Sequence, residues 1–130
     1  MESALRAALI AWLRADAELS AHVNLVAEEE TARAALPWLA LVASASVDWS
    51  TKDRTGREIR VAFELRTRGD APDADADLVG LVERRLAALP RAQDGFDIAS
   101  ATFLRARHER RANNLRGSLV EYRFRCLSTQ

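Results

Sequence analysis

The side chains best suited to nucleophilic or general-base chemistry are few in this sequence. Its two histidines, His22 and His108, lie far apart along the chain, and its single cysteine is Cys126. A catalytic histidine needs a neighbouring nucleophile and a group that orients its ring. No G-x-S-x-G motif, glycine-rich phosphate loop or dinucleotide fingerprint occurs. The sequence therefore predicts a protein that is not an enzyme and that uses no cofactor.

One acidic group has a spacing that resembles a cation-binding loop, namely Asp73, Asp75 and Asp77. A calcium-binding loop of the EF-hand type also needs a central glycine and a glutamate at its twelfth position, and neither falls in place here. Acidic side chains at the start of a helix interact favourably with the helix dipole. We interpret the three aspartates in that way and expect no metal site.

A group of basic side chains near the C-terminal end is the main candidate for binding. Its members are Arg105, Arg107, His108, Arg110, Arg111 and Arg116. On a hairpin of residues 105–116, with a long polar loop at 108–115, they could contact phosphate groups. The segment holds no aromatic side chain on which a base could stack. A solvated, charge-bearing loop explains the same residues, and so does a hairpin that docks on a protein.

The run Glu28, Glu29 and Glu30 is the acidic counterpart of this group. It reads as a solvated loop or the first turn of a short helix. It could also be the surface that the basic hairpin of an identical neighbour reaches. Such a contact joins two different patches, and contacts of that kind can close a ring.

A second candidate interface lies in the turn that precedes the clearest strand. Its side chains are Trp49, Lys52 and Arg54. An aromatic residue at this place more often packs within a hairpin than binds a partner. Because loops frequently carry binding residues, we keep all three as candidate contacts.

The composition is typical of one soluble globular domain. The 130 residues are 48% hydrophobic and 29% charged, with a formal net charge of zero, which argues against bulk attraction to nucleic acid or membrane. We expect residues 1–130 to form a single domain. One cysteine allows no intrachain disulfide, and no signal peptide or membrane-spanning run is apparent. We expect the protein to be made in the cytoplasm.

The pattern of apolar residues predicts an α/β protein of the α+β type. Ile59, Val61, Phe63 and Leu65 alternate with charged residues, which is the period of a strand. Gly56 ends the turn before it and is free to adopt a positive φ. Further strands are expected at residues 37–47, 96–107 and 116–127, with a short one at 23–27. In the strand at 96–107, Ile98, Thr102 and Leu104 are expected on one side.

Two amphipathic helices complete the expected fold. Residues 2–16 place Leu5, Leu9 and Leu13 on one face, with Ser3 as a plausible N-cap and Trp12 as a core anchor. Residues 73–89 form the other helix, with Pro72 in its first turn. We therefore expect an antiparallel or mixed sheet of about four to five strands, with two main helices packed on one face.

Several segments, taken in this order, resemble the tail completion or tail terminator family of long-tailed phages and gene transfer agents. They are residues 13–19 (LRADAEL), 36–39 (LPWL), 48–51 (DWST), 56–58 (GRE), the helix at 73–89 and residues 123–125 (RFR). The likeness extends from about residue 5 to residue 127. One departure is residues 23–28, where members of the family carry an aromatic residue and this chain has none.

The resemblance implies a structural protein that forms a homo-oligomeric, hexameric ring. Such a ring caps the head-proximal end of the tail tube, ends tube polymerisation and meets the head. The implied partners are other copies of the chain, the major tail tube protein and the head–tail connector protein, with DNA passing through the lumen. Assembly in the host cytoplasm followed by a place in the particle is implied, without a membrane partner. The alternatives are a head-side neck component and a small nucleic-acid-binding module that uses the hairpin of residues 105–116.

Overall fold

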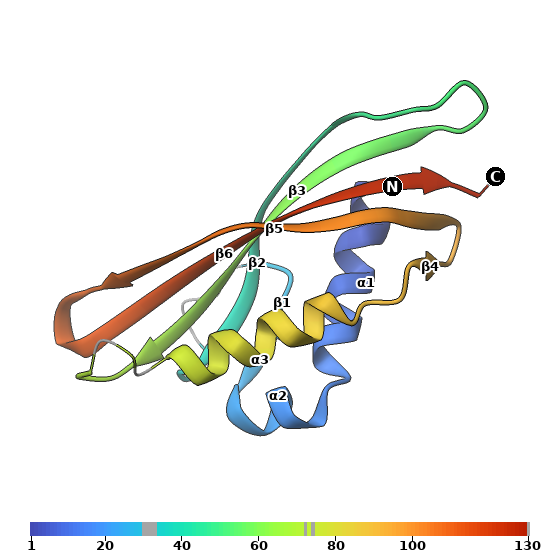
Figure 1. Cartoon of the computed structure of the whole chain (residues 1–130). Coiled ribbons are helices and arrows are strands. Elements are labelled where there is room, and N and C mark those ends of the chain that lie inside the picture. The colour runs from blue at the N-terminus through green and yellow to red at the C-terminus, as the bar shows by residue number, and fades with distance from the viewer. Residues whose placement is uncertain (30–33, 72, 74, 130) are drawn as a thin grey trace.

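A computed structural model describes residues 1–29, 34–71, 73 and 75–129 of the chain. One sheet and a layer of helices make up the molecule (Figure 1). The elements in chain order are α1 (Glu2–Arg14), α2 (Ala17–His22), β1 (Leu25–Ala27), β2 (Trp38–Asp48), β3 (Gly56–Arg68), α3 (Ala76–Ala87), β4 (Ala92–Gln93), β5 (Phe96–Arg110), the short 3₁₀ helix η1 (Ala112–Asn114) and β6 (Leu115–Ser128).

The six strands lie in the order β1-β2-β3-β6-β5-β4. All neighbouring strands are antiparallel except β1 and β2, so the sheet is mixed. The predicted α+β class with its mixed sheet is confirmed. The sixth strand is β4, which pairs with β5 at two positions only and was not expected. A pairing that short leaves no periodic pattern in a sequence.

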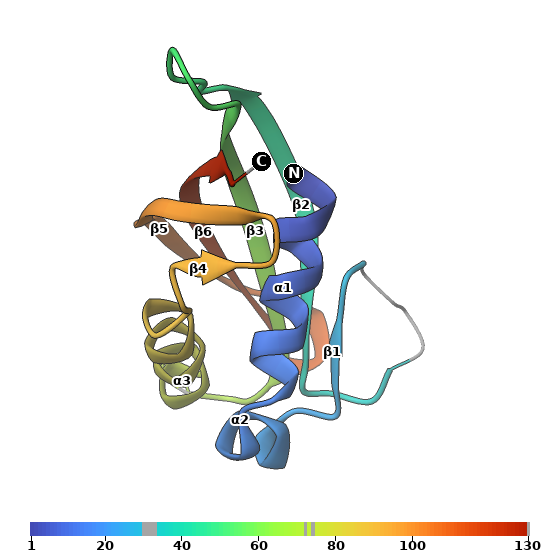
Figure 2. The ribbon, with the colours of Figure 1, turned by 90° about the vertical axis from the view of Figure 1, so that its right-hand side faces the viewer.

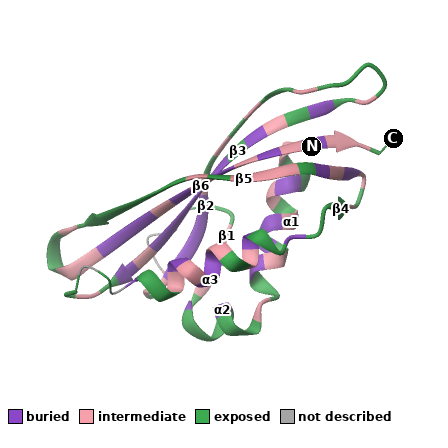
Figure 3. Cartoon of the chain, in the orientation of Figure 1, coloured by how far each residue is buried: buried purple, intermediate pink, exposed green. Residues whose placement is uncertain are grey.

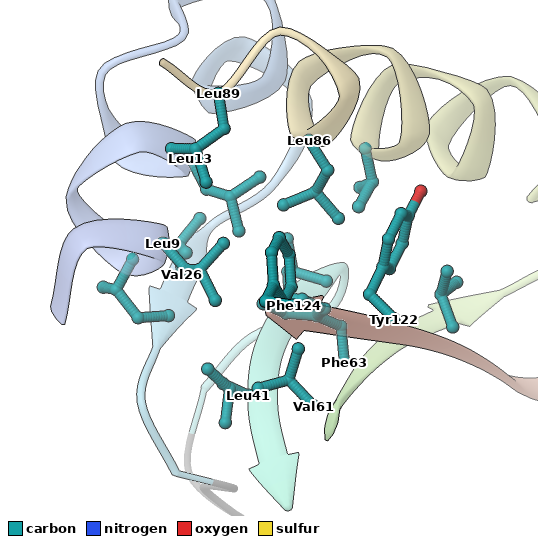
Figure 4. Packing of buried hydrophobic residues seen from close by; sticks show 14 of the residues in the cluster. Leu9, Leu13, Val26, Leu41, Val61, Phe63, Leu86, Leu89, Tyr122 and Phe124 are labelled. Carbon is teal, nitrogen blue, oxygen red and sulfur yellow. The ribbon is translucent and has the colours of Figure 1, made fainter. Parts of the chain in front are cut away.

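The hydrophobic core lies between one face of the sheet and the helices. Ile59, Val61 and Phe63 of β3 belong to this core, as do Tyr122 and Phe124 of β6. Figure 4 shows Val61, Phe63, Tyr122 and Phe124 packed together with side chains of the helices. Along most of β6 buried residues alternate with more exposed ones, whereas residues 61–65 in the centre of β3 are all buried (Figure 3). The predicted apolar face of β3 and the placement of the two main helices on one face of the sheet are confirmed.

Trp12 and Arg85 join the two main helices. The Trp12 Nε1 donates to the Arg85 carbonyl oxygen at 2.6 Å, and the Arg85 Nε donates to the Trp12 carbonyl oxygen at 2.8 Å. The Arg85 guanidinium carbon lies 3.4 Å from the centroid of the Trp12 ring. Trp12 is thus half-buried and packs against the hydrophobic core, where it also holds α3. The cap assigned to Ser3 is wrong, because α1 begins at Glu2 with Met1 as its N-cap.

The start of α3 differs from the expectation. The helix begins at Ala76, so only Asp77 of the three aspartates lies in its first turn. The carboxylate of Asp75 is buried and accepts a hydrogen bond from the hydroxyl of Ser118. Asp75 therefore ties the start of α3 to β6 instead of facing solvent. Pro72, placed in the first turn by the sequence, lies outside the described residues.

A bulge changes the expected faces of β5. The register with β6 shifts between Ile98 and Ser100, and again between Phe103 and Arg105. As a result Ile98 and Ala101 both pair with buried residues of β6, while Thr102 pairs with Arg123 on the other face. A bulge inserts one residue and so moves the following side chains to the opposite face. The assignment of Ile98 to the side of Thr102 is therefore wrong.

Two hairpins extend from opposite ends of the sheet. The turn between β2 and β3 lies beyond the pair Asp48–Arg57, whereas the turn between β5 and β6 lies at the level of the other end of β3. Figure 1 shows both hairpins projecting past the helices, and Figure 2 shows the β2–β3 hairpin extending beyond the top of the helix layer. Within the described part of the chain, no helix combines the length and apolar character that a membrane crossing requires.

Candidate interaction site

The β5–β6 hairpin ends in a tight turn, not in a long loop. Arg110 still pairs with Arg116, and only residues 111–114 lie between the two strands. Asn113 and Asn114 both have a φ of 59°, a left-handed conformation that asparagine tolerates better than most residues. The expected loop at 108–115 is therefore wrong. Instead, the basic residues stand on two paired strands, and the outer part of β5 in this arm is exposed (Figure 3).

Most basic side chains of this arm have acidic partners. Arg105 forms an ion pair with Glu121 on the neighbouring strand, and this bond raises the pKa of the guanidinium. Arg107 lies 3.3 Å from the carboxylate of Glu109. Exposed pairs of this kind add little to stability. They do, however, reduce the positive charge that the arm offers to an anion.

Arg111 connects two carboxylates. It lies 3.2 Å from Glu64 on β3 and 3.2 Å from Glu109 on its own arm. The hydrogen bond from Arg111, with the positive charge of Arg107 beside it, lowers the pKa of Glu109. Glu64 is almost fully buried and also pairs with Arg66, so this network ties the turn end of the arm to β3.

Arg116 is not a surface residue. Its side chain is buried and donates hydrogen bonds to the carbonyl oxygens of Gly69 and Asp70, at 3.0 and 3.3 Å. Arg116 therefore secures the chain that leaves β3, and the structure contradicts its placement at the exposed tip. His108 lies beside it on the arm, with Nδ1 2.9 Å from the hydroxyl oxygen of Ser118. Of the basic group, Arg110 is the exposed residue nearest the turn, and it donates to the side chain of Asn114.

The second candidate interface is the hairpin between β2 and β3. Lys52 is exposed at its tip. Arg54 turns back to the sheet, where it bonds the carbonyl oxygen of Ser128 at 2.7 Å and the carboxylate of Asp97 at 3.0 Å. Trp49 packs within the hairpin, with the Arg125 guanidinium carbon 5.6 Å from its ring centroid. Lys52 is thus presented to solvent, while Arg54 and Trp49 hold the hairpin in place.

Gly56 is required in this hairpin for a reason other than the one predicted. Its φ is not positive, since Gly95 is the glycine with a positive φ among the described residues. A Cβ at position 56 would lie 2.4 Å from the Trp49 carbonyl oxygen and 2.8 Å from that of Cys126. The close approach of two backbones therefore excludes a side chain.

The acidic run is not beside the basic arm of the same chain. Glu28 pairs with Arg6 of α1, whose guanidinium also bonds the hydroxyl of Ser44 at 2.8 Å. Glu29 is exposed, and Glu30 lies outside the described residues. Any meeting of the basic arm with this run would have to involve a second molecule.

The face of the sheet opposite the helices was not expected to hold a site. It carries a shallow depression of about 210 Å³, and its apolar lining comes from three alanines together with Val61 and Leu104. Arg60 and Glu121 also line this depression. In the sequence, the sign of this face was the set of charged residues that alternate with apolar residues along β3. No group of three or more acidic, histidine or cysteine side chains suited to a metal ion occurs among the residues described.

Comparison with known proteins identifies the family. Residues 7–127 match the model of a family described as tail completion protein gp17. The chain belongs to this tail completion family. The match covers nearly the whole sequence, which confirms the resemblance seen in its segments. A family of structural tail proteins also supports the expectation that the chain is not an enzyme.

A solved structure shares the fold of this tail completion protein. It is a chain from the virion of a native gene transfer agent particle, with a TM-score of 0.80 and 23% sequence identity. The alignment covers 97% of this chain and 96% of that one. No curated protein sequence matches the chain.

Proposed function

We propose that this tail completion protein is a tail terminator. In this role, copies of the chain form a ring at the head-proximal end of a phage-like tail tube. The resemblance to the family implies that this ring is a hexamer. The ring ends tube polymerisation and allows the head to join. The observation that carries the proposal is the family match over residues 7–127. The shared fold with a chain of a gene transfer agent virion adds support for a place in such a particle.

The two projecting hairpins suit a protein that lies between two different partners. One end of the sheet presents Lys52 and Asp53, and the other presents Arg110. In a ring whose strands follow the ring axis, these ends would form two chemically different rims. We assign one rim to the major tail tube protein and the other to the head–tail connector protein.

The contact residues of these rims follow from exposure. Arg107, Arg110, Lys52 and Glu29 are exposed and can reach a partner. Arg116 is engaged within the chain and acts as a positioning residue. An exposed basic arm that faces the channel of a ring could also contact DNA in transit through its phosphates.

The experiment that tests the proposal is electron microscopy of particles from a producer strain that lacks this gene. Overlong tubes without heads are the expected result, because nothing would then stop polymerisation. Tails of normal length that fail to join heads would move the protein to the neck of the particle. Complete, normal particles would refute a role in tail completion by this chain.

A paired variant separates protein docking from nucleic-acid binding by the arm. The change is Arg107→Glu together with Arg110→Glu, because both side chains are exposed. If the arm docks on a protein, head joining or ring formation is lost. If the arm is a nucleic-acid module, salt-sensitive DNA affinity is lost and the oligomer stays intact. Arg84→Glu on the exposed side of α3 is the matched control and should change neither.

A further inference from the structure

Both outer edges of the long-stranded sheet lack a partner over much of their length. β1 pairs with β2 only at residues 38–40, and β4 pairs with β5 only at residues 96–97. Beyond these positions no strand in the described part of the chain pairs with the outer edge of β2 or of β5. An unpaired edge presents a row of backbone donors and acceptors that a second strand can bind.

The open segments within these edges lack the charges and prolines that commonly prevent such pairing. Residues 41–47 and residues 98–104 contain no charged residue and no proline. Natural edge strands are commonly protected by charges, prolines or bulges. Here the bulges flank the open segments instead, which leaves residues 43–48 of β2 and residues 100–103 of β5 in regular pairing with their inner neighbours.

The exposed apolar side chains lie on these same two strands. Within the described chain, the large hydrophobic side chains that are exposed are Val47 on β2, at 59%, and Phe103 on β5, at 47%. Exposed apolar groups beside an unpaired backbone edge are typical of a surface that a protein partner covers. Each edge therefore supplies both backbone groups and apolar area.

The two open segments are level with each other across the sheet. Following the register from strand to strand, Val47 shares a row with Ser100, and Ala45 shares a row with Thr102. β2 and β5 run in opposite directions, because three antiparallel pairings separate them. A second copy placed beside the first without a shift along the strands would therefore meet it in antiparallel register.

We propose that copies of this chain join edge to edge, with residues 100–103 of one copy pairing with residues 44–47 of the next. The inference rests on the proposed ring and states how its subunits are held together. Two different edges meet at every contact, so the association is heterologous. Since the segments are level, each addition needs no rise along the strands, so a constant rotation between successive copies closes them into a ring and not into a helical filament. The small side chains of both segments leave room for the approaching strand.

Cysteine pairs test this contact in assembled material. The variant Ala45→Cys with Thr102→Cys, in a Cys126→Ala background, places two thiols on the open face in one row. Facing residues of an antiparallel pair have Cβ atoms about 5 Å apart, so a short thiol-to-thiol reagent can join them. Treated particles should yield a ladder of covalent multimers. A mixture of the two single-cysteine chains should yield dimers only, and neither chain alone should yield any.

A second pair and a blocking variant keep the test decisive. Val47→Cys with Ser100→Cys probes the adjacent row on the same face and should cross-link equally. Ala45→Lys should prevent oligomer formation, whereas Ala87→Lys at an exposed position of α3 should not. If chains assemble into rings and neither cysteine pair cross-links, edge pairing is overturned and the terminator proposal stands. If the unaltered chain forms no oligomer in solution or in particles, both are overturned.

Discussion

Replacing Arg85 with methionine tests whether the clamp between α1 and α3 holds the helix layer together. Methionine keeps an apolar side chain against the Trp12 ring but removes the guanidinium. The variant therefore loses the cation–π contact at 3.4 Å and the hydrogen bond to the Trp12 carbonyl oxygen at 2.8 Å. The bond from the Trp12 indole to the Arg85 backbone uses no side-chain atom of Arg85, so it can persist.

The expected loss follows from these two contacts. A cation–π contact contributes about 0.5–2 kcal/mol, depending on how far it is desolvated. A hydrogen bond from a charged donor contributes about 1.5–3 kcal/mol. Both groups are partly exposed to water, so the lower ends of the ranges apply, and the free energy of unfolding should fall by about 2 kcal/mol. In a domain of this length the melting temperature should fall by roughly 8 °C.

Urea unfolding followed by far-UV circular dichroism measures this change. Arg84→Met is the control, because Arg84 is the neighbouring arginine on the exposed side of the same helix. It should lower the free energy of unfolding by less than about 0.5 kcal/mol. Equal losses in the two variants, or a loss below about 0.5 kcal/mol for Arg85→Met, would refute a stabilising role for the clamp.

Three further predictions follow from the packing. Gly56→Ala should cost about 3 kcal/mol or more in urea unfolding, because two carbonyl oxygens lie within 2.8 Å of the new Cβ; an unchanged midpoint would contradict the contact. Burial raises the pKa of the Cys126 thiol to about 11 from an ordinary 9.0. The contribution of the neutral thiol to the free energy of unfolding should therefore be complete below pH 9 and be lost as the pH rises towards 11. The variant Cys126→Ala should lack this part of the pH dependence. Arg116→Met should speed proteolytic cleavage near Gly69, with Arg110→Met as the unaffected control.

The strands and their faces could be predicted where one side is buried and the other is charged. Ile59, Val61 and Phe63 alternate with neighbours that are charged except for Ala62, and this pattern predicted both the strand and its inner face. The same logic failed at Ile98, because a bulge depends on how two strands fit together and leaves no sign in the periodicity of one of them. The start of α3 was misplaced for a related reason. Asp75 bonds a serine distant in sequence, which helix-dipole reasoning cannot foresee.

The sequence identified the basic residues near the C-terminal end as a group, but it did not predict which of them are paired with acidic residues or buried. The sequence shows seven arginines and a histidine after residue 104. It cannot reveal that Glu121 of β6 pairs with Arg105, or that Glu64 of β3 pairs with Arg111. Strand pairing at long sequence separation decides which charges are neutralised. It also decided that Arg116 points inward to two carbonyl oxygens.

The length of the strands beyond the helix layer gives the molecule a graded resistance to local opening. β5 and β6 run for 15 and 14 residues, whereas the helices cover only part of that length (Figure 1). Amide hydrogens over the core can exchange with solvent only when much of the domain opens, while those near the hairpin turns exchange when a few terminal pairs fray. A partner that binds the hairpin ends therefore contacts the segments that open at the lowest free energy, while the core between them stays folded.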